Sequence, residues 1–376
     1  MLNMKNAKYN KKILFVLPTL AGGGAERVSC NLINRLYRDG VDVGLFLYKK
    51  EGEYIDLLNK NIVIYTGGNN AGLCTVFWRL LRISSKYDVI VGCSEFMPTY
   101  LVVMAAILQN KKSIGWVHTN IDAALKDEGL FKSVIHKFLL VPIFYGCVSR
   151  IIFVSNGAKK SFSKYLRNSS LGKVECIYNP IDLDMIVDKG KQKIESLEAY
   201  PMLTAVGRLE KVKNYPLLFE AFKLFLNEYP NAKLIILGEG SLKESLQQQV
   251  NDMGILSNVI FKGFQQNPYP YIKRSDILVM SSRFEGLPTV LIEALKLGTD
   301  IVTVDCPGGI REILNNGRLG IIVENDNPVS LCNGFKMAIE NKRMKNNLKD
   351  EINEACNRFS FARVIPQFKK IFDLSI

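Results

Sequence analysis

The chain has 376 residues, which exceeds the length at which a single hydrophobic core usually stops growing, so two domains are expected. A hydrophobic fraction of 48% and a charged fraction of 23% are typical of a soluble globular protein. The formal charge of +13 is concentrated in residues 1–180, where 24 Lys and Arg stand against 12 Asp and Glu. This basic half suits nucleic acid, an anionic membrane or an acidic substrate, although an ordinary solvated surface explains it equally well.

The cysteines, histidines and apolar runs indicate which metal sites, cellular compartment and membrane segments to expect. Eight cysteines without a CxxC pair and only two histidines argue against a zinc site and favour buried free thiols in a reducing cytoplasm. The apolar run 13–17 is too short for a signal peptide and is interpreted as a first buried strand. Runs 97–108 and 138–148 fall short of the roughly 20 residues that span a bilayer, so no spanning helix is predicted.

Short β-branched runs alternate with longer helical patterns through most of the chain. Strands are predicted at 13–17, 42–48, 62–65, 88–92, 113–117, 151–154, 174–177, 202–206, 233–237, 259–262, 277–280, 300–304 and 320–323. Helices are predicted at 25–38, 73–86, 97–109, 131–148, 215–228, 241–253, 268–274, 289–297, 309–315, 328–341 and 343–357. This alternation predicts parallel sheets with crossover helices, in two doubly wound α/β domains.

The boundary between the domains is marked by the turn signal Tyr178-Asn179-Pro180. We therefore expect a first domain at 1–180, a second at 181–360 and a last helix at about 361–376. In open α/β sheets ligands bind beyond the C-terminal ends of the strands, so the expected site is a cleft between the two domains.

Three glycines, Gly22-Gly23-Gly24, follow the first predicted strand and precede a predicted helix. Glycine lets a ligand approach the backbone, and the N–H groups of a helix N-terminus can bind an anion. The spacing is not GxGxxG, so these glycines are only a weak match to a dinucleotide-binding fingerprint. A tight strand-to-helix turn without a ligand is the alternative.

His118 directly follows the predicted strand 113–117. A histidine at a strand end can donate to a ligand hydroxyl or act as an acid or base, and a structural histidine is the alternative. His136 lies inside an apolar helical pattern, where simple packing is expected.

Residues 129–150 combine many apolar side chains with flanking Lys and Arg. Such a segment can lie on a membrane surface. We expect instead that its apolar face belongs to a long core helix kinked at Pro142, and keep the membrane hypothesis for its basic and aromatic side.

Asp182-Leu183-Asp184 matches the DxD pattern that binds a divalent metal and a nucleotide diphosphate. The tripeptide follows a turn and not a site strand, and a magnesium site also needs substrate phosphates close by, so no metal is expected there.

The segment from Gly207 to Asn214 follows the first strand of the second domain and carries Arg208 and Lys213. Arg supplies forked donors and Lys a mobile point charge, a combination that suits a diphosphate. A solvated basic turn is the alternative.

Glu285 precedes a helix predicted near Pro288, and Glu293 is placed about two turns inside that helix. Eight helical steps span roughly 12 Å, more than the carboxyl separations of about 5 Å or about 6.5–9.5 Å found in glycosidases. The two carboxylates therefore fit two ends of one long ligand, with helix N–H groups between them for an anion. Two solvated carboxylates are the alternative.

Taken together, the glycine-rich first loop, Gly207-Arg208 with Lys213, and the Glu-x7-Glu segment in Ser-Arg-Phe-Glu-Gly-Leu-Pro resemble the retaining glycosyltransferases of family four. Asn179-Pro180-Ile181-Asp182 and Asp305-Cys306-Pro307-Gly308-Gly309 are similar to that family's segments as well. The resemblance covers nearly the whole chain and implies the GT-B fold, in which two Rossmann-like doubly wound domains face each other across a cleft that binds a nucleotide-sugar.

The resemblance implies a donor site mainly in the second domain. Arg208 and Lys213 would hold the donor diphosphate, and Glu293 would bond the ribose hydroxyls. Glu285 would contact the transferred sugar.

Backbone and base contacts are implied in the same way. The amides of Gly286 and Leu287 would lie near the sugar, and Phe264 with Gln265 would border the base.

In the first domain the resemblance implies that Gly23 and Gly24 approach the phosphates and that His118 lies near the sugar. The last helix would cross back to this domain.

The resemblance further implies retention of anomeric configuration, with the leaving phosphate assisting the acceptor, and no cofactor or metal. Our leading hypothesis is transfer of a hexose or N-acetylhexosamine from a nucleoside diphosphate donor, UDP favoured, to a lipid-linked or surface-polysaccharide acceptor. We expect a cytoplasmic protein in peripheral contact with the anionic inner face of the plasma membrane. The alternatives are another GT-B enzyme such as an epimerase and, more remotely, a basic nucleic-acid-binding protein, for which no reader motif is present.

Overall fold

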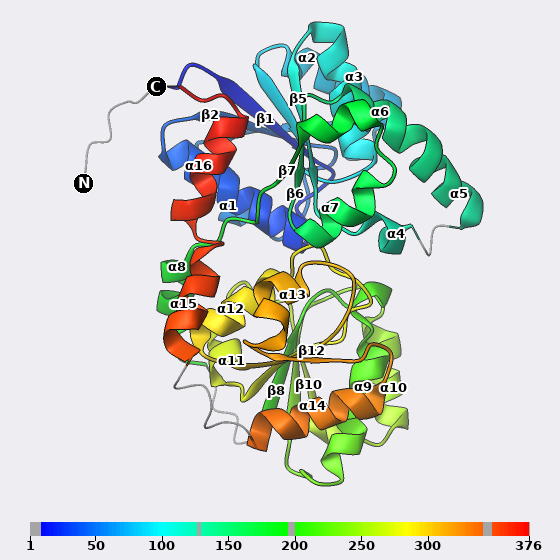
Figure 1. Cartoon of the computed structure of the whole chain (residues 1–376), viewed down its shortest axis with the longest axis vertical. Coiled ribbons are helices and arrows are strands. Elements are labelled where there is room, and N and C mark those ends of the chain that lie inside the picture. Colours follow the sequence, from blue (N-terminus) through cyan, green and yellow to red (C-terminus); the bar gives the residue numbers. More distant parts are fainter. Residues whose placement is uncertain (1–8, 126–128, 195–199, 341–347, 376) are drawn as a thin grey trace. The chain divides into compact units, whose positions relative to one another are not determined.

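The computed structural model describes residues 9–125, 129–194, 200–340 and 348–375 (Figure 1). The chain divides into two compact units, one made of residues 1–181 and 361–376 and the other of residues 182–360. Each unit holds one parallel sheet with helices around it, so the predicted fold class of two doubly wound α/β domains is confirmed.

The first unit contains a seven-stranded sheet with the order β3-β2-β1-β4-β5-β6-β7. Its central strands are continuous apolar runs, as expected for parallel strands covered on both faces. The strands are β1 (Lys12–Leu17), β2 (Asp42–Leu47), β3 (Val63–Thr66), β4 (Val89–Gly92), β5 (Lys112–Val117), β6 (Arg150–Phe153) and β7 (Val174–Cys176). The helices are α1 (Gly24–Arg38), α2 (Leu73–Ser84), α3 (Met97–Gln109), α4 (Ile121–Ala124), α5 (Leu130–Ile135), α6 (Val141–Cys147), α7 (Asn156–Ser163) and α16 (Phe361–Ile371).

The second unit contains a six-stranded sheet with the order β10-β9-β8-β11-β12-β13. The strands are β8 (Met202–Val206), β9 (Lys233–Leu237), β10 (Val259–Gly263), β11 (Ile277–Met280), β12 (Asp300–Val304) and β13 (Ile321–Val323). The helices are α8 (Leu183–Lys189), α9 (Tyr215–Leu226), α10 (Lys243–Asp252), α11 (Tyr269–Arg274), α12 (Thr289–Leu297), α13 (Ile310–Ile313), α14 (Pro328–Glu340) and α15 (Lys349–Asn357).

Both sheets reverse their strand order once. The first chain segment runs outward from β1 to β3 and then returns to β4, which pairs with β1 on its other side. The second segment does the same with β8, β10 and β11. Such a reversal opens a crevice beyond the C-terminal strand ends, where ligands of this fold class bind.

The thirteen predicted strands are all present, with ends shifted by at most one residue. The short helices α4, α7 and α8 were not predicted. The start of the helix predicted at 343–357 lies outside the described residues.

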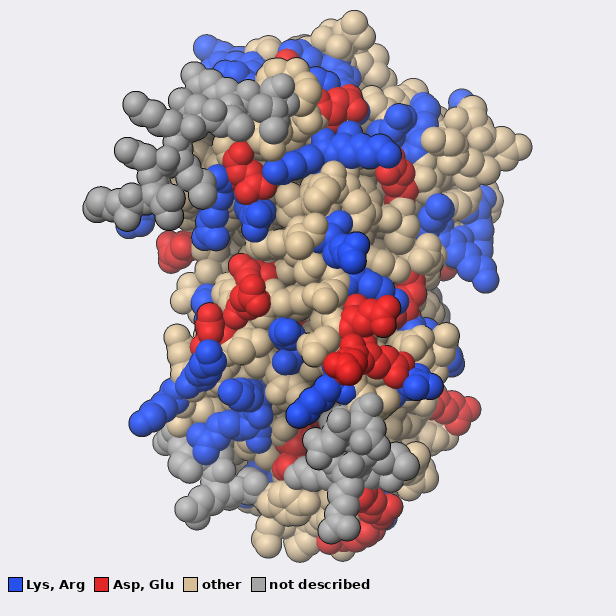
Figure 2. Space-filling model, turned by 60° about the vertical axis from the view of Figure 1, so that its left-hand side comes forward, with Lys and Arg blue, Asp and Glu red and all other residues tan. Residues whose placement is uncertain are grey.

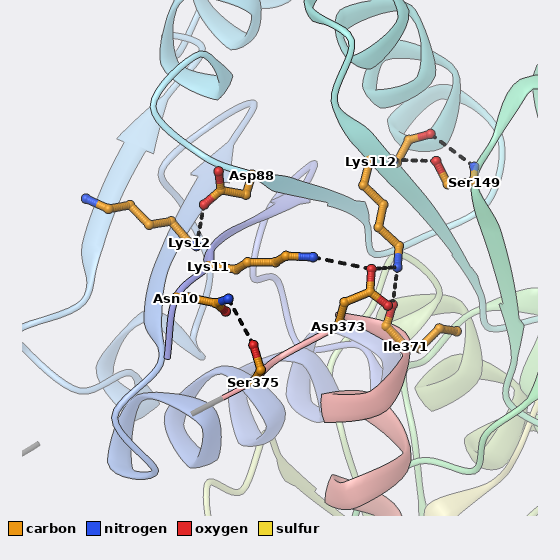
Figure 3. A network of polar contacts seen from close by, with 10 residues as sticks. Asn10, Lys11, Lys12, Asp88, Lys112, Ser149, Ile371, Asp373 and Ser375 are labelled. Carbon is orange, nitrogen blue, oxygen red and sulfur yellow. Dashed lines mark hydrogen bonds and ion pairs between the residues drawn. The ribbon is translucent and has the colours of Figure 1, made fainter. Parts of the chain in front are cut away.

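The C-terminal helix α16 belongs to the first unit. Lys112 Nζ donates to Asp373 Oδ2 at 2.7 Å and to the carbonyl of Ile371 at 2.8 Å, and Lys11 pairs with the same carboxylate at 3.3 Å (Figure 3). Both lysines hold the pKa of Asp373 below its usual range, so this attachment stays charged at neutral pH.

The segment 130–147 differs from its prediction in two ways. It forms one helical stretch in which a π-helical turn, His136–Leu140, joins α5 to α6 just before Pro142. Pro142 has no N–H to donate, which favours a local departure from α-helical bonding. The stretch Leu130–Cys147 is long and apolar enough to cross a membrane by length and composition, and only 11% of it is buried.

The prediction that this apolar face is a core helix therefore holds for the α6 end, where Val141 and Tyr145 are buried in the core, and is wrong for the α5 end, where Leu130 and Phe131 are exposed. The expectation of buried free thiols is wrong for one cysteine of this helix, because Cys147 is an exposed free thiol. His136 packs as expected, with its ring 4.8 Å from that of Phe96 and its Nδ1 3.1 Å from the hydroxyl of Tyr100.

Candidate functional site

Three loops of the second unit meet at the C-terminal ends of neighbouring strands. They follow β8 (207–214), β11 (281–288) and β12 (305–309). β8 and β11 are the strands between which the order reverses, so the loops lie at the switch point where a ligand is expected.

An ion pair connects the first two loops. Lys213 Nζ lies 2.6 Å from Glu285 Oε1, and the side chains are only 23% and 14% exposed. An ammonium group has three N–H donors, so two remain for other acceptors when one serves Glu285. The pair thus presents a cation and a carboxylate side by side. A cation suits the phosphates of a ligand, and a carboxylate can accept hydrogen bonds from its hydroxyls.

The path of the Lys213 side chain depends on Gly207. A Cβ atom on Gly207 would lie 2.9 Å from Lys213 Cε, closer than real Cβ contacts. The Gly207 carbonyl also accepts from the Tyr215 hydroxyl at 2.9 Å, which fixes this turn against α9. A glycine here lets the lysine chain cross the backbone toward Glu285.

Glu285 is held from the other side by the loop after β12. Its backbone N–H donates to the Pro307 carbonyl at 2.9 Å, and Gly309 N–H donates to the Gly286 carbonyl at 2.9 Å. Gly308 has φ of +144°, and a Cβ there would lie 2.2 Å from the Glu285 carbonyl oxygen. Only glycine permits this approach.

Further bonds join the β8 and β11 loops. Arg283 N–H donates to the Val212 carbonyl and Ser281 Oγ to the Lys213 carbonyl, each at 2.8 Å. Backbone and side-chain bonds together therefore preorganise the Lys213–Glu285 pair.

The carboxylate of Glu285 affects the pKa values of two neighbouring groups. Burial raises the pKa of the Cys306 thiol and Glu285 raises it further. Burial, with a smaller effect of Glu285, also raises the pKa of Tyr215. Both groups stay protonated at neutral pH, so Cys306 is not a reactive thiolate.

Glu293 is buried in α12, with only 5% of the residue exposed. The alternative of two solvated carboxylates is therefore wrong. Glu293 is the fifth residue of α12, which begins at Thr289, so it lies on the second helical turn and not two turns inside. The 12 Å estimate for the pair does not apply, because only half of the intervening steps are helical.

The other predicted donor residues of this unit lie along the same sheet edge. Arg208 is exposed in the β8 loop, and Gly286 and Leu287 are both buried. Phe264 and Gln265 follow β10, which is two strands from β8, and Gln265 Nε2 donates to the Lys262 carbonyl at 2.9 Å.

The first unit has a second group of polar residues at its own switch point. Gly23 is the N-cap of α1 and Gly24 its first residue. Among the described residues no heavy atom lies within 4 Å of where a Gly24 Cβ would be, whereas a Gly23 Cβ would lie 2.0 Å from Glu26 Oε2. The backbone is thus open at Gly24 and covered by a carboxylate at Gly23.

Glu95, which the sequence analysis did not single out, lies in this group. It follows β4, and its Oε2 accepts from the backbone N–H of His118, after β5, at 3.2 Å. Burial raises the pKa of the Glu95 carboxyl, an effect that Glu26 increases. The next residue, Phe96, has φ of 62° and ψ of −120°, and a non-glycine residue held in such a conformation is a common sign of a functional site.

His118 packs on the indole of Trp116 with 4.5 Å between ring centroids. Burial lowers its pKa from 6.5 to about 3, so the imidazole is neutral at physiological pH. Its Nε2 is buried without a hydrogen-bond partner within the described part of the chain. The His118 Nε2 atom can therefore form one hydrogen bond with a ligand, but the neutral ring does not supply a positive charge.

Asp182 caps a helix. Its Oδ1 accepts from the backbone N–H of Met185 at 3.0 Å, the usual N-cap bond at the start of α8. Across residues 9–125, 129–194, 200–340 and 348–375, no group of three or more His, Cys, Asp or Glu could hold a metal ion.

Two family models match the chain almost end to end. Residues 22–185 match the model described as Glycosyltransferase Family 4, and residues 187–355 match Glycosyl transferases group 1. The division between the models falls near the boundary between the two structural units.

Curated relatives align over nearly their full length. The N-acetylgalactosamine-N,N'-diacetylbacillosaminyl-diphospho-undecaprenol 4-alpha-N-acetylgalactosaminyltransferase of Campylobacter jejuni is 29% identical, covering 94% of this chain and 97% of its own. The UDP-Gal:alpha-D-GlcNAc-diphosphoundecaprenol alpha-1,3-galactosyltransferase of Escherichia coli is 26% identical, covering 98% of both.

Among solved structures, that of Anabaena HepE in complex with UDP and glucose matches with a TM-score of 0.82 at 19% identity, covering 97% of this chain and all of the other. This similarity concerns the fold, which is GT-B. From the two family models, their nearly complete coverage and the fold, the chain is a glycosyltransferase that belongs to the group 1 and family 4 glycosyltransferases.

Proposed function

We propose that this glycosyltransferase transfers a hexose or N-acetylhexosamine from a UDP-sugar to a lipid-linked glycan acceptor, with retention of anomeric configuration. The second unit binds the donor and the first unit binds the acceptor. The observation that carries the donor half of the proposal is the preorganised Lys213–Glu285 pair at the switch point of the second sheet.

The names of the relatives support the choice of substrates. The Campylobacter and Escherichia enzymes both act on sugars attached to diphospho-undecaprenol, and the Escherichia enzyme uses UDP-Gal. The Anabaena structure contains UDP and glucose. Both named enzymes form alpha linkages, and an α-linked product from a donor whose sugar–phosphate bond is also α is the retaining outcome.

The chemistry assigns the pair two roles. The acceptor oxygen bonds to the anomeric carbon while the bond from that carbon to the β-phosphate oxygen breaks, and the acceptor proton passes to the leaving phosphate. Negative charge grows on the diphosphate, where the two remaining donors of Lys213 stabilise it. Glu285 holds Lys213 in place and accepts from a hydroxyl of the transferred sugar.

The remaining donor contacts follow the order of the loops along the sheet edge. The exposed guanidinium of Arg208 binds the diphosphate, and Glu293 bonds the ribose. The Gly286 and Leu287 amides serve the sugar, and Phe264 with Gln265 borders the base. No metal or other cofactor takes part.

On the acceptor side, Glu95 and His118 supply the polar groups. The neutral imidazole of His118 gives a hydrogen bond to a hydroxyl without attracting the phosphates, and the Glu95 carboxyl anchors the His118 backbone. The open backbone at Gly24 admits a phosphate group, with Gly23 beside it.

Because the acceptor is lipid-linked, we place the enzyme in the cytoplasm at the inner face of the plasma membrane, in peripheral contact with anionic lipid. On the face drawn in Figure 2, Lys and Arg are scattered among Asp, Glu and other residues and do not form one continuous stripe.

The test is a turnover assay with a panel of UDP-sugars and a polyprenyl diphosphate acceptor that carries one or two sugars. Release of UDP that requires the acceptor, together with an extended glycolipid, is the expected result. Conversion of the sugar nucleotide to an epimer without an acceptor would establish the alternative GT-B activity. A salt-dependent shift of duplex DNA or RNA without sugar transfer would support nucleic-acid binding.

A further inference from the structure

Exposed apolar side chains are concentrated on one face of the first unit. Of the nineteen large apolar residues that are exposed in the described part of the chain, twelve lie on α2, α3 and the helix Leu130–Cys147. The most exposed are Leu130 at 85%, Phe131 at 80% and Phe138 at 68%. The twelve, which we call the α2–α3–α6 face, are Leu73, Trp78, Met97, Met104, Ile107, Leu108, Leu130, Phe131, Val134, Phe138, Leu139 and Ile143.

The three helices form one continuous surface. α2 packs against α3, and α3 packs against α6. In Figure 1 they lie together, and the α5 end of the helix Leu130–Cys147 extends away from the sheet of the unit. An exposed apolar area of this extent is uncommon on a soluble domain and marks an interaction site.

The charges on the same helices all have one sign. Within their bounds α2, α3 and the helix Leu130–Cys147 contain four Lys and Arg and no Asp or Glu. Arg82 and Lys132 are exposed. Lys137 is less exposed and forms an ion pair with Asp122 at 3.0 Å. Apolar side chains interleaved with cations are what an anionic lipid surface attracts, because cations contact headgroups while apolar groups enter the acyl boundary.

The helix Leu130–Cys147 is anchored in the core of the first unit at its α6 end. Val141 and Tyr145 are fully buried in a core cluster with Val117, Phe153 and other residues of the unit. A spanning orientation would remove both side chains from that core. The exposed residues, by contrast, are concentrated in the half that includes α5 and the π-helical turn, which is free to lie in the interface plane.

We propose that the α2–α3–α6 face is a docking surface for an anionic phospholipid bilayer, with Phe131 and Phe138 inserted at the acyl boundary and Arg82 and Lys132 on the headgroups. The inference rests on the proposed function in one respect only: docking brings the acceptor site of the first unit to the membrane that holds a lipid-linked acceptor.

The first experiment is vesicle flotation of the full chain, with phosphatidylcholine vesicles and with vesicles that contain about one third phosphatidylglycerol. The wild type floats with the anionic vesicles. The double variant Phe131→Asp/Phe138→Asp loses at least about tenfold in the bound fraction, and Arg82→Gln/Lys132→Gln loses the preference for anionic vesicles.

The matched control is Leu256→Asp/Val329→Asp, which introduces the same charges at apolar positions of the second unit that are 51% and 55% exposed. It should float like the wild type. Circular dichroism and thermal unfolding verify that each variant is folded, and the Gln variant, which alters only surface charge, keeps the test valid if the Asp variant is unstable.

A second readout separates this inference from the proposed function. With a water-soluble, short-chain acceptor, the Phe131→Asp/Phe138→Asp variant retains wild-type transfer, and with an acceptor embedded in vesicles it loses transfer. Flotation without transfer to any acceptor would refute the proposed function and leave docking intact. Equal flotation of wild type and variants, or a stable dimer without lipid that the Asp variant disrupts, would overturn the docking proposal.

Discussion

Replacing Lys213 by Met removes the charge of the ion pair while keeping a chain of similar length. Because Lys213 Nζ lies 2.6 Å from Glu285 Oε1 and both side chains are mostly buried, the change leaves a carboxylate without its cation. Removing one partner of a fully buried pair costs about 3–5 kcal/mol, and this pair retains some hydration, so we expect a loss of about 1–3 kcal/mol in the free energy of unfolding.

The effect on transfer has a different origin. Lys213 is proposed to meet the charge that grows on the leaving diphosphate, and removal of one such preorganised group typically lowers kcat by about 10²–10³-fold. The assays are acceptor-dependent release of UDP, with kcat and KM resolved, and urea unfolding of the same variant.

The double variant Lys213→Met/Glu285→Gln separates the two effects. With both charges removed, stability should return to near the wild-type value, because no buried charge remains unpaired. Transfer should stay low, because the cation and the sugar-binding carboxylate are both missing. If the double variant regained transfer to within about tenfold of the wild type, the ion pair would be structural and the assigned roles would be refuted.

Three further changes test the surroundings of the two sites. Gly207→Ala pushes a Cβ to 2.9 Å from Lys213 Cε, so transfer should fall while urea stability changes little, and a wild-type rate would show that the path of Lys213 is unimportant. Gly308→Ala places a Cβ 2.2 Å from the Glu285 carbonyl oxygen at φ of +144°, so both stability, by about 1–3 kcal/mol, and transfer should fall. His118 has a pKa of about 3 in the fold against 6.5 ordinarily, so its contribution to stability, present above pH 6.5, is lost as pH falls toward 3 at up to about 1.4 kcal/mol per pH unit. His118→Asn should flatten that part of the pH dependence measured by urea unfolding, and an unchanged slope would contradict the burial of a neutral imidazole.

The sheets were predictable because their strands are continuous β-branched apolar runs bounded by turns, as in Ile277–Met280 before the Glu285 loop. The alternation of strands and helices was enough to predict that Glu285 and Lys213 lie at strand ends in one domain. It did not predict their direct contact, because the two residues are 72 positions apart and no local pattern encodes which loops meet. The contact depends on β8 pairing with β11, a non-local choice of strand order.

Two misjudgements have physical causes. Apolar content predicts burial for the whole helix Leu130–Cys147, yet only its α6 end enters the core, because burial depends on what packs against a helix and composition does not specify that. Glu95 was not singled out because a lone carboxylate in a loop has no periodicity or spacing that distinguishes it. Its position in the candidate site is seen only in the structure, from the hydrogen bond donated by the His118 backbone N–H and from the strained backbone of Phe96.

Mass spectrometry of a polyprenyl diphosphate-linked acceptor after incubation with the full chain and individual UDP-sugars tests the central claim most directly. The account predicts that one UDP-sugar adds a single hexose or N-acetylhexosamine residue, with UDP formed in equal amount, and that Lys213→Met and Glu285→Gln abolish most of this addition. An acceptor that gains no sugar from any UDP-hexose or UDP-N-acetylhexosamine, or one that both variants extend at the wild-type rate, would contradict it.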